Sequence, residues 1–224
     1  MTVLGDLVWT DLDGRRAVLV VPVGSLEQHG PHLPLDTDTR IAAAIAARAV
    51  DGRTDAVLGP PITIGASGEH AGFPGTLSIG TDALATALTE LVRSADAFAG
   101  TVFVNGHGGN LEALRRAMTT ATDEGRVAQA WSPSIPGGDA HAGRTETSLL
   151  LAIDPSCVRV DALEPGSTDA IGDVLDRLRV DGVRAIAPNG VLGDPTAATA
   201  AEGSTVLEAL VSELRTRLDD WFPA

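Results

Sequence analysis

AVLVVPVGSLEQHGPHLPLDTD, residues 17–38, joins an apolar run to a cluster of histidines and carboxylates. The run from Ala17 to Val23 is continuous, which is typical of a strand buried on both faces of a parallel sheet. Glu27 and His29 are two residues apart, so their side chains would point to the same side of an extended segment. Because ligands of open α/β sheets bind beyond the carboxyl ends of the strands, this stretch predicts the first half of a metal site there.

Strand and helix patterns alternate along the rest of the chain. Short apolar segments predict buried strands, whereas apolar residues spaced three and four apart predict helices. We expect strands at residues 15–23, 56–59, 101–104 and 127–131, and helices at 39–50, 82–99, 111–124, 145–153, 171–178 and 204–221. Residues 1–14 are expected to be irregular, with Trp9 anchored against the core, and Asn110 is expected to cap the third helix. The alternation predicts an α/β fold with a largely parallel sheet, in a single domain of residues 1–224.

Composition and charge exclude several classes of protein. The net charge of −14 disfavours a nucleic-acid partner or an anionic membrane surface, because binding phosphate requires clustered positive charge. The apolar runs are too short to span a membrane, and the acidic start of the chain lacks the basic region of a secretory signal. The single cysteine, Cys157, rules out an internal disulfide framework and fits a reducing compartment, so we expect a cytoplasmic protein. The absence of lysine removes Schiff-base chemistry and the lysine of a phosphate loop, and the absence of tyrosine removes a tyrosine general acid.

A second histidine motif is VNGHGGN, residues 104–110. It carries His107 directly after another buried strand, so His107 can meet Glu27 and His29 if the two strands are parallel neighbours. Asp38, at the entry to the first helix, could reach the same point and bridge two ions. Imidazole and carboxylate ligands suit zinc, iron or manganese. The alternative interpretation of VNGHGGN is a tight strand-to-helix turn with an incidental histidine.

A third motif, DAHAGRTETS at residues 139–148, adds His141 and Glu146. Glu146 falls in the first turn of a predicted helix, where the helix dipole alone favours a carboxylate. Beside two other histidine-bearing loops, a metal-ligand role for Glu146 is the better interpretation. His141 is then free to act as a proton donor or a substrate contact.

The Gly-rich loop at residues 62–80 has a length that compact domains usually reserve for function. Its Ser67, Glu69 and His70 could line the pocket, and the alternative is a surface loop stabilised by turn glycines. The chain has no G-x-S-x-G elbow and no Walker motif, so a serine hydrolase or a phosphate-loop enzyme is disfavoured.

Four motifs in one order, GSLEQHGPHLPLDTD, FPGT, VNGHGGN and HAGRTETS, resemble the creatininase family of metal-dependent amidohydrolases. The resemblance covers about residues 16–155, and GVLGDPTAATAAEG extends it toward the C-terminus. It implies a creatininase-like three-layer sandwich, two divalent ions per subunit (Fe²⁺ or Zn²⁺, with Mn²⁺ also accepted) and a closed homo-oligomer such as a hexamer. Within the family, DTDTRIA, GASGEHAGFPGT and GGDAHAG look closest to peptidases that remove the C-terminal dipeptide unit of a modified, ribosomally made precursor peptide.

The resemblance also assigns metal ligands. It implies that Glu27, Asp38 and His107 hold one ion, and that His29, Asp38 and a further carboxylate hold the other. Asp38 would then bridge the two ions.

The chain departs from the creatinine-hydrolysing branch of the family directly after His107. That branch carries an aromatic residue at the position of Gly108 and a glutamate at the position of Gly109. The resemblance therefore disfavours creatinine as the substrate and makes Glu146 the replacement ligand.

We therefore expect a metal-dependent hydrolase of an amide or peptide bond. His141 and Glu146 are the expected catalytic residues, with His141 protonating the leaving amine. The expected substrate contacts are Ser67, Glu69, His70, Gly108 and Asp139. The alternatives are a deformylase acting on a formamidopyrimidine, a hydrolase of a creatinine-like cyclic amide, and a metal-binding protein without enzymatic activity.

Overall fold

The computed structural model describes residues 1–223, and it describes their side chains except those of Ile171, Leu175 and Arg179. Four strands form one sheet in the order β2-β1-β3-β4, and every neighbouring pair is parallel. Their bounds are β1 Val18–Val23, β2 Ala56–Leu58, β3 Gly100–Asn105 and β4 Ala128–Trp131. The two central strands are buried throughout, as their continuous apolar runs predicted.

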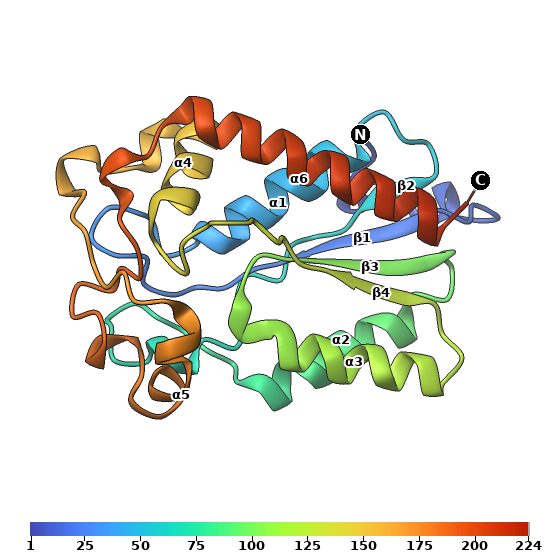
Figure 1. Ribbon diagram of the computed structural model, residues 1–224. Coiled ribbons are helices and arrows are strands. Elements are labelled where there is room, and N and C mark those ends of the chain that lie inside the picture. The colour runs from blue at the N-terminus through green and yellow to red at the C-terminus, as the bar shows by residue number, and fades with distance from the viewer. Residues whose placement is uncertain (224) are drawn as a thin grey trace.

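Helices cover both faces of the sheet, which makes the three layers visible in Figure 1. One layer contains α1 (Thr37–Val50), α4 (Arg144–Ile153) and α6 (Ala200–Trp221). The opposite layer contains α2 (Thr81–Ser94) and α3 (Leu111–Asp123). The expected α/β fold with a parallel sheet is therefore confirmed.

The alternation of side chains along the strands divides the core between these layers. Val18 and Val20 of β1 pack with the first layer, whereas Leu19 and Val21 pack with the second. A smaller apolar cluster lies outside the sandwich, where α5 (Ile171–Asp181) packs near the 68–73 loop. α5 runs three residues beyond the predicted end at residue 178.

Three local predictions were wrong. Trp9 does not anchor the N-terminal segment, because 78% of its surface is exposed. The helix predicted to end at residue 99 ends at Ser94, since turns at residues 95–98 lead the chain into β3. Asn110 precedes α3 but makes no capping hydrogen bond, because its amide binds the backbone of Gly24 and Ala66 instead. In the part of the chain that the structure describes, no helix is long and apolar enough to cross a membrane.

Candidate metal centre

The carboxyl ends of β1 and β3 bring two of the histidine motifs together. The strands are neighbours in register, with Val23 opposite Asn105, so the loops that follow them leave the sheet side by side. Asp38 joins them from the first turn of α1. Gly106 permits this close approach, because a Cβ at that position would lie only 2.5 Å from the carbonyl oxygen of Asp38.

Asp38 is the centre of the resulting cluster. Its Oδ1 lies 3.0 Å from Nε2 of His29, and its Oδ2 lies 3.1 Å from Nδ1 of His107. On the far side of His107, Nε2 lies 3.2 Å from Oε2 of Glu27. Glu146 approaches from α4, with Oε2 3.9 Å from Nε2 of His29. The structure thus brings together all five residues that were predicted as ligands.

Among the described residues, three groups of three side chains could hold a metal ion, with their ligand atoms within 4.8 Å of one another. Two of the groups share Asp38 and together contain the five predicted ligands, whereas the third combines two of those ligands with His141. These sets are Glu27, Asp38 and His107; His29, Asp38 and Glu146; and Glu27, His29 and His141. A carboxylate shared by two such groups fits a binuclear metal site.

The donor atoms themselves fit bound cations. Both carboxylate oxygens of Glu27 are buried and accept no hydrogen bond, although imidazoles lie beside them, and a buried carboxylate is costly unless positive charge compensates it. Nδ1 of His29 lies 3.1 Å from the carbonyl oxygen of Glu27, where it can donate a hydrogen bond. That bond leaves the lone pair on Nε2, which faces the cluster, in the arrangement that protein metal sites commonly use.

When no cation is bound, burial and the charges within the cluster favour the protonated forms of Glu27, Glu146 and His29. Burial raises the pKa of Glu27 to about 7 and that of Glu146 to about 7. Burial opposes protonation of His29, but the charge and hydrogen bond of Asp38 outweigh it and raise the pKa of His29 to about 10. The pKa of Asp38 falls well below its usual range despite burial, because His29 and His107 stabilise its charge. Cations and protons therefore compete for the same oxygens and nitrogens.

His141 reaches the cluster from a loop rather than from a strand. Its ring centroid lies 4.4 Å from that of His29, and its backbone pairs with Leu192 through two hydrogen bonds. Burial, followed by the charges of His29 and His70, lowers the pKa of His141 well below its ordinary value. The next residue, Ala142, has φ 51°, which is a strained conformation for a residue with a Cβ, and its N–H donates to Glu146 Oε2 at 2.6 Å.

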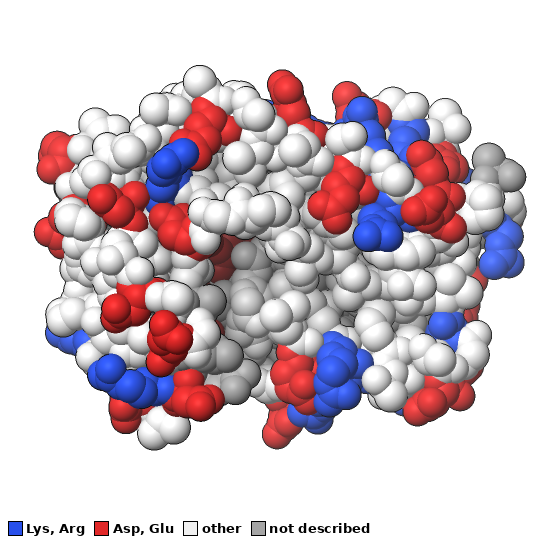
Figure 2. All heavy atoms as spheres, viewed as in Figure 1, with Lys and Arg blue, Asp and Glu red and all other residues white. Residues whose placement is uncertain are grey.

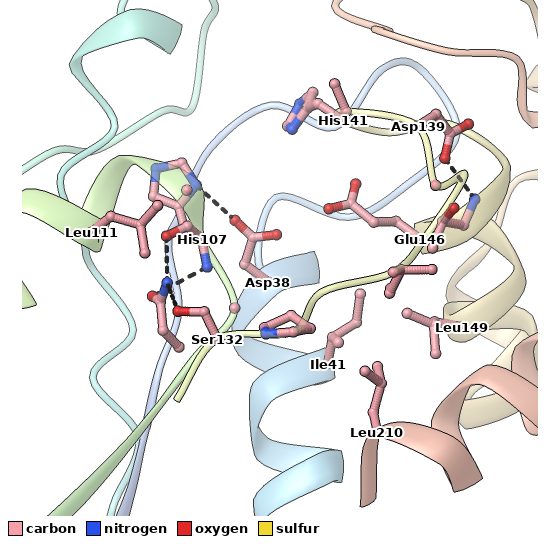
Figure 3. A pocket seen from close by; sticks show the side chains of 18 residues that line it. Asp38, Ile41, His107, Leu111, Ser132, Asp139, His141, Glu146, Leu149 and Leu210 are labelled. Atoms are coloured by element: carbon pink, nitrogen blue, oxygen red, sulfur yellow. Dashed lines mark hydrogen bonds and ion pairs between the residues drawn. The ribbon is translucent and has the colours of Figure 1, made fainter. Parts of the chain in front are cut away.

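A cavity of about 260 Å³ opens beside the cluster. Figure 2 shows the surface hollowed beyond the ends of β3 and β4, and Figure 3 shows the side chains that line the cavity. One wall carries Asp38, His107, His141 and Glu146. The side chains of Ile41, Leu149 and Leu210 form an apolar wall below Asp38 and Glu146 in Figure 3, and Leu111 lies beside His107. No sequence pattern predicts this wall, because core residues and cavity residues follow the same helical spacing.

The predicted substrate contacts occupy different positions around the cluster. Gly108 and Asp139 line the cavity, but both oxygens of Asp139 accept backbone N–H groups at the start of α4 (Figure 3). Ser67 and His70 are buried, and Nε2 of His70 lies 3.3 Å from Oε1 of Glu27. Glu69 lies 3.4 Å from Nε2 of His107. Their contact with a substrate stays a prediction.

Comparison with known proteins identifies the class of protein that this fold and cluster define. A family model described as "Creatininase: Creatinine amidohydrolase" matches residues 6–218, so the chain belongs to the creatininase family. The chain is 51% identical to the mycofactocin precursor peptide peptidase of Mycolicibacterium smegmatis, over 98% of this chain and 92% of that protein. The family and the peptidase branch that the motifs indicated are both confirmed.

Solved structures agree with the family assignment. A structure described as "Creatininase Mn" superimposes with a TM-score of 0.82 and 26% identity, covering 100% of both chains. A mutant creatininase of Zn-Zn type superimposes with a TM-score of 0.81 and 26% identity, covering 99% of this chain and 98% of that one. The first of these structures is described with manganese and the second with zinc.

Proposed function

We propose that this protein is a metal-dependent peptidase of mycofactocin biosynthesis. It hydrolyses the modified precursor peptide and releases the C-terminal dipeptide unit derived from Val-Tyr. The observation that carries the proposal is the pair of ligand groups that share Asp38, in a chain 51% identical to a mycofactocin precursor peptide peptidase.

The proposed ligands of one ion are Glu27, Asp38 and His107, and those of the other are His29, Asp38 and Glu146. Zn²⁺, Fe²⁺ and Mn²⁺ all suit this mixture of imidazoles and carboxylates. When bound, such ions polarise an amide carbonyl and make water a nucleophile near neutral pH.

His141 is the proposed proton carrier of the reaction. Its lowered pKa makes the ring neutral at pH 7, so it can take a proton from the attacking water. The same proton then passes to the leaving nitrogen, whose bond to the carbonyl carbon breaks. General acid–base catalysis of this kind contributes about a hundred- to ten-thousandfold in rate.

The apolar wall of the cavity supports an apolar leaving unit. Ile41, Leu149 and Leu210 line the cavity, and no arginine is among the described residues that line it. A unit derived from Val-Tyr would bury its side chains against this wall, at about 25 cal/mol per Å² of apolar surface.

Incubation with two substrates tests the proposal. The modified precursor peptide should yield the C-terminal dipeptide unit, detected by mass spectrometry, and a formamidopyrimidine nucleotide should remain intact. Release of formate from the nucleotide, with the peptide uncleaved, would support the deformylase alternative instead. We also propose a closed homo-oligomer, such as a hexamer, on the basis of the family, and light scattering after size-exclusion chromatography measures it directly.

A further inference from the structure

Gln28 lies between two proposed ligands, Glu27 and His29, but its side chain serves neither of them. It is 6% exposed. Its amide nitrogen lies 3.0 Å from the carbonyl oxygen of Gly190, 3.0 Å from Nδ1 of His70 and 3.0 Å from Nε2 of His141. One amide group therefore meets two imidazoles that both border the metal centre.

Backbone groups fix the orientation of this amide. The N–H of Gly30 donates to Oε1 of Gln28 at 2.9 Å, and the carbonyl oxygen of Gly190 can only accept. The nitrogen must therefore face Gly190. An amide nitrogen carries two hydrogens, and since Gly190 takes one, a single hydrogen remains for the two imidazoles.

The backbone of Gln28 decides which imidazole receives that hydrogen. The carbonyl oxygen of Gln28 lies 2.9 Å from Nε2 of His141 and can only accept, so this nitrogen of His141 carries a hydrogen. The remaining amide hydrogen of Gln28 is then donated to Nδ1 of His70. Both rings consequently hold their own hydrogen on Nε2.

These tautomers determine what each ring presents to the metal centre. The Nε2–H of His70 lies on the side of Glu27, with Nε2 3.3 Å from Oε1, although the two groups do not form a hydrogen bond in this structure. His141 presents the lone pair of Nδ1, which lies 3.8 Å from the same oxygen. An N–H group of His70 and a lone pair of His141 therefore flank Glu27, and the amide of Gln28 is compatible only with this tautomer of His70.

We propose that Gln28 is a positioning residue, whose side-chain amide sets the tautomer of His70 and whose backbone carbonyl sets that of His141. It acts through the two rings and does not contact the reacting atoms. The kinetic part of this inference rests on the proposed function, whereas the tautomers can be measured without any substrate.

The backbone near Gly190 leaves room for this amide. Gly190 has φ 81°, and a Cβ at that position would overlap the amide oxygen of Gln28. Two residues later, Leu192 pairs with the backbone of His141. The GVLGDPTAATAAEG motif thus holds both Gln28 and one of the rings that Gln28 orients.

Histidine-selective ¹⁵N NMR of the Zn²⁺-loaded protein tests the inference. In the wild type, both His70 and His141 should show the Nε2–H tautomer. In Gln28→Glu the carboxylate can only accept, so Nδ1 of His70 should gain a hydrogen, while His141 keeps Nε2–H because its acceptor is the backbone. A wild-type His70 with its hydrogen on Nδ1, or a His70 unchanged in Gln28→Glu, would overturn the inference.

Kinetics with the modified peptide give a second readout. Gln28→Glu should lower kcat by about 10- to 100-fold, the usual cost of losing an outer partner of a metal site, with KM within about twofold. The control is Gln129→Glu, which makes the same chemical change at the half-buried Gln129 of β4 and should alter neither value. Gly190→Ala, which pushes on the same amide, should reproduce the loss of kcat if Gln28→Glu fails to fold.

The outcomes separate this inference from the proposed function. Predicted tautomers in a wild type that leaves the peptide intact would refute the proposed function and uphold the role of Gln28. A wild type that cleaves the peptide but shows other tautomers would refute the role of Gln28 alone. An unchanged kcat in both Gln28→Glu and Gly190→Ala would also refute it.

Discussion

The carboxyl edge of the sheet and the 139–146 loop face the same cavity, but the fold holds them differently. At the edge, the side chains of Glu27, His29 and His107 are almost fully buried and follow directly from neighbouring parallel strands. The 139–146 segment begins eight residues after β4 ends and enters the first turn of α4, where Glu146 keeps 21% of its side chain exposed. The sheet therefore fixes the position of the ligands at the edge, whereas hydrogen bonds made outside the sheet hold the loop.

The partners in these hydrogen bonds come from the C-terminal half of the chain and from the loop itself. Leu192 pairs with the backbone of His141, and the carboxylate of Asp139 accepts the N–H of Thr145 at 2.9 Å. A change at the edge should therefore affect metal binding directly. A change in the loop should affect one ion or the local stability.

Replacing an edge ligand should have the largest effect. His107→Ala removes the imidazole that contacts both Glu27 and Asp38. We expect loss of bound metal and a fall in peptide turnover of about a thousandfold or more, because Lewis-acid stabilisation is worth several kcal/mol. Metal analysis by plasma mass spectrometry and a peptide assay measure both effects. A variant that keeps two ions and full activity would contradict the direct role of the edge in metal binding.

Removing the ions should destabilise the protein, because ions that bind the folded cluster and not the unfolded chain stabilise the folded state. Ions present at a hundred times their dissociation constant contribute about 2.7 kcal/mol each. For a chain of this size, about 2.7 kcal/mol corresponds to a fall in Tm of roughly 5–10 °C. Thermal unfolding with and without a chelator measures the shift, and re-addition of Zn²⁺ should restore the Tm.

The chelated protein should also lose stability as pH rises above 7. The pKa of His29 is raised to about 10 and that of His107 lies well above its ordinary value, so their contributions are complete below about pH 6.5. The contribution of His29 disappears as pH rises toward 10, and that of His107 disappears as pH rises through its own raised pKa, because the folded state must give up protons that the unfolded state has already lost. The Tm of the chelated protein should fall between pH 7 and 10, and the gap from the Zn²⁺-loaded protein should widen. A gap that stays constant or narrows over this range would contradict the assignment.

Replacing the ligand of the loop should have a narrower effect. Glu146→Gln keeps an oxygen that can accept the N–H of Ala142 but loses the charge beside His29. We expect the affinity for one ion to fall by about 10- to 100-fold while the other ion is retained. Metal titration of the chelated variant measures the affinities for the two ions separately. Equal weakening of both ions would show that the loop belongs to the same rigid frame as the edge.

The smallest effect is expected at the strained residue of the loop. Ala142→Gly relieves a positive φ that costs a residue with a Cβ about 1–2 kcal/mol, partly offset by the greater freedom of glycine in the unfolded chain. We expect a gain in stability of up to about 1 kcal/mol by chemical denaturation. Gly143→Ala is the matched contrast, because its Cβ would overlap the carboxylate of Asp139, and it should destabilise the protein.

The sequence predicts the edge better than the loop, for physical reasons. Buried parallel strands are continuous apolar runs, so the residues after Val23 and Asn105 could be placed at one edge without knowledge of the fold. Gln28 and Gly190 are 162 positions apart, and no local pattern predicts that they meet. The 161–188 segment has no strong periodicity, and its packing beside the 68–73 loop depends on tertiary contacts alone.

Electron paramagnetic resonance of the Mn²⁺-loaded protein tests the central claim most directly, namely that Asp38 bridges two ions. At two equivalents of Mn²⁺ per chain, the account predicts an exchange-coupled spectrum from a pair of ions, which Asp38→Asn should abolish. Binding of a single equivalent, or two equivalents with the six-line spectrum of isolated ions, would contradict the account.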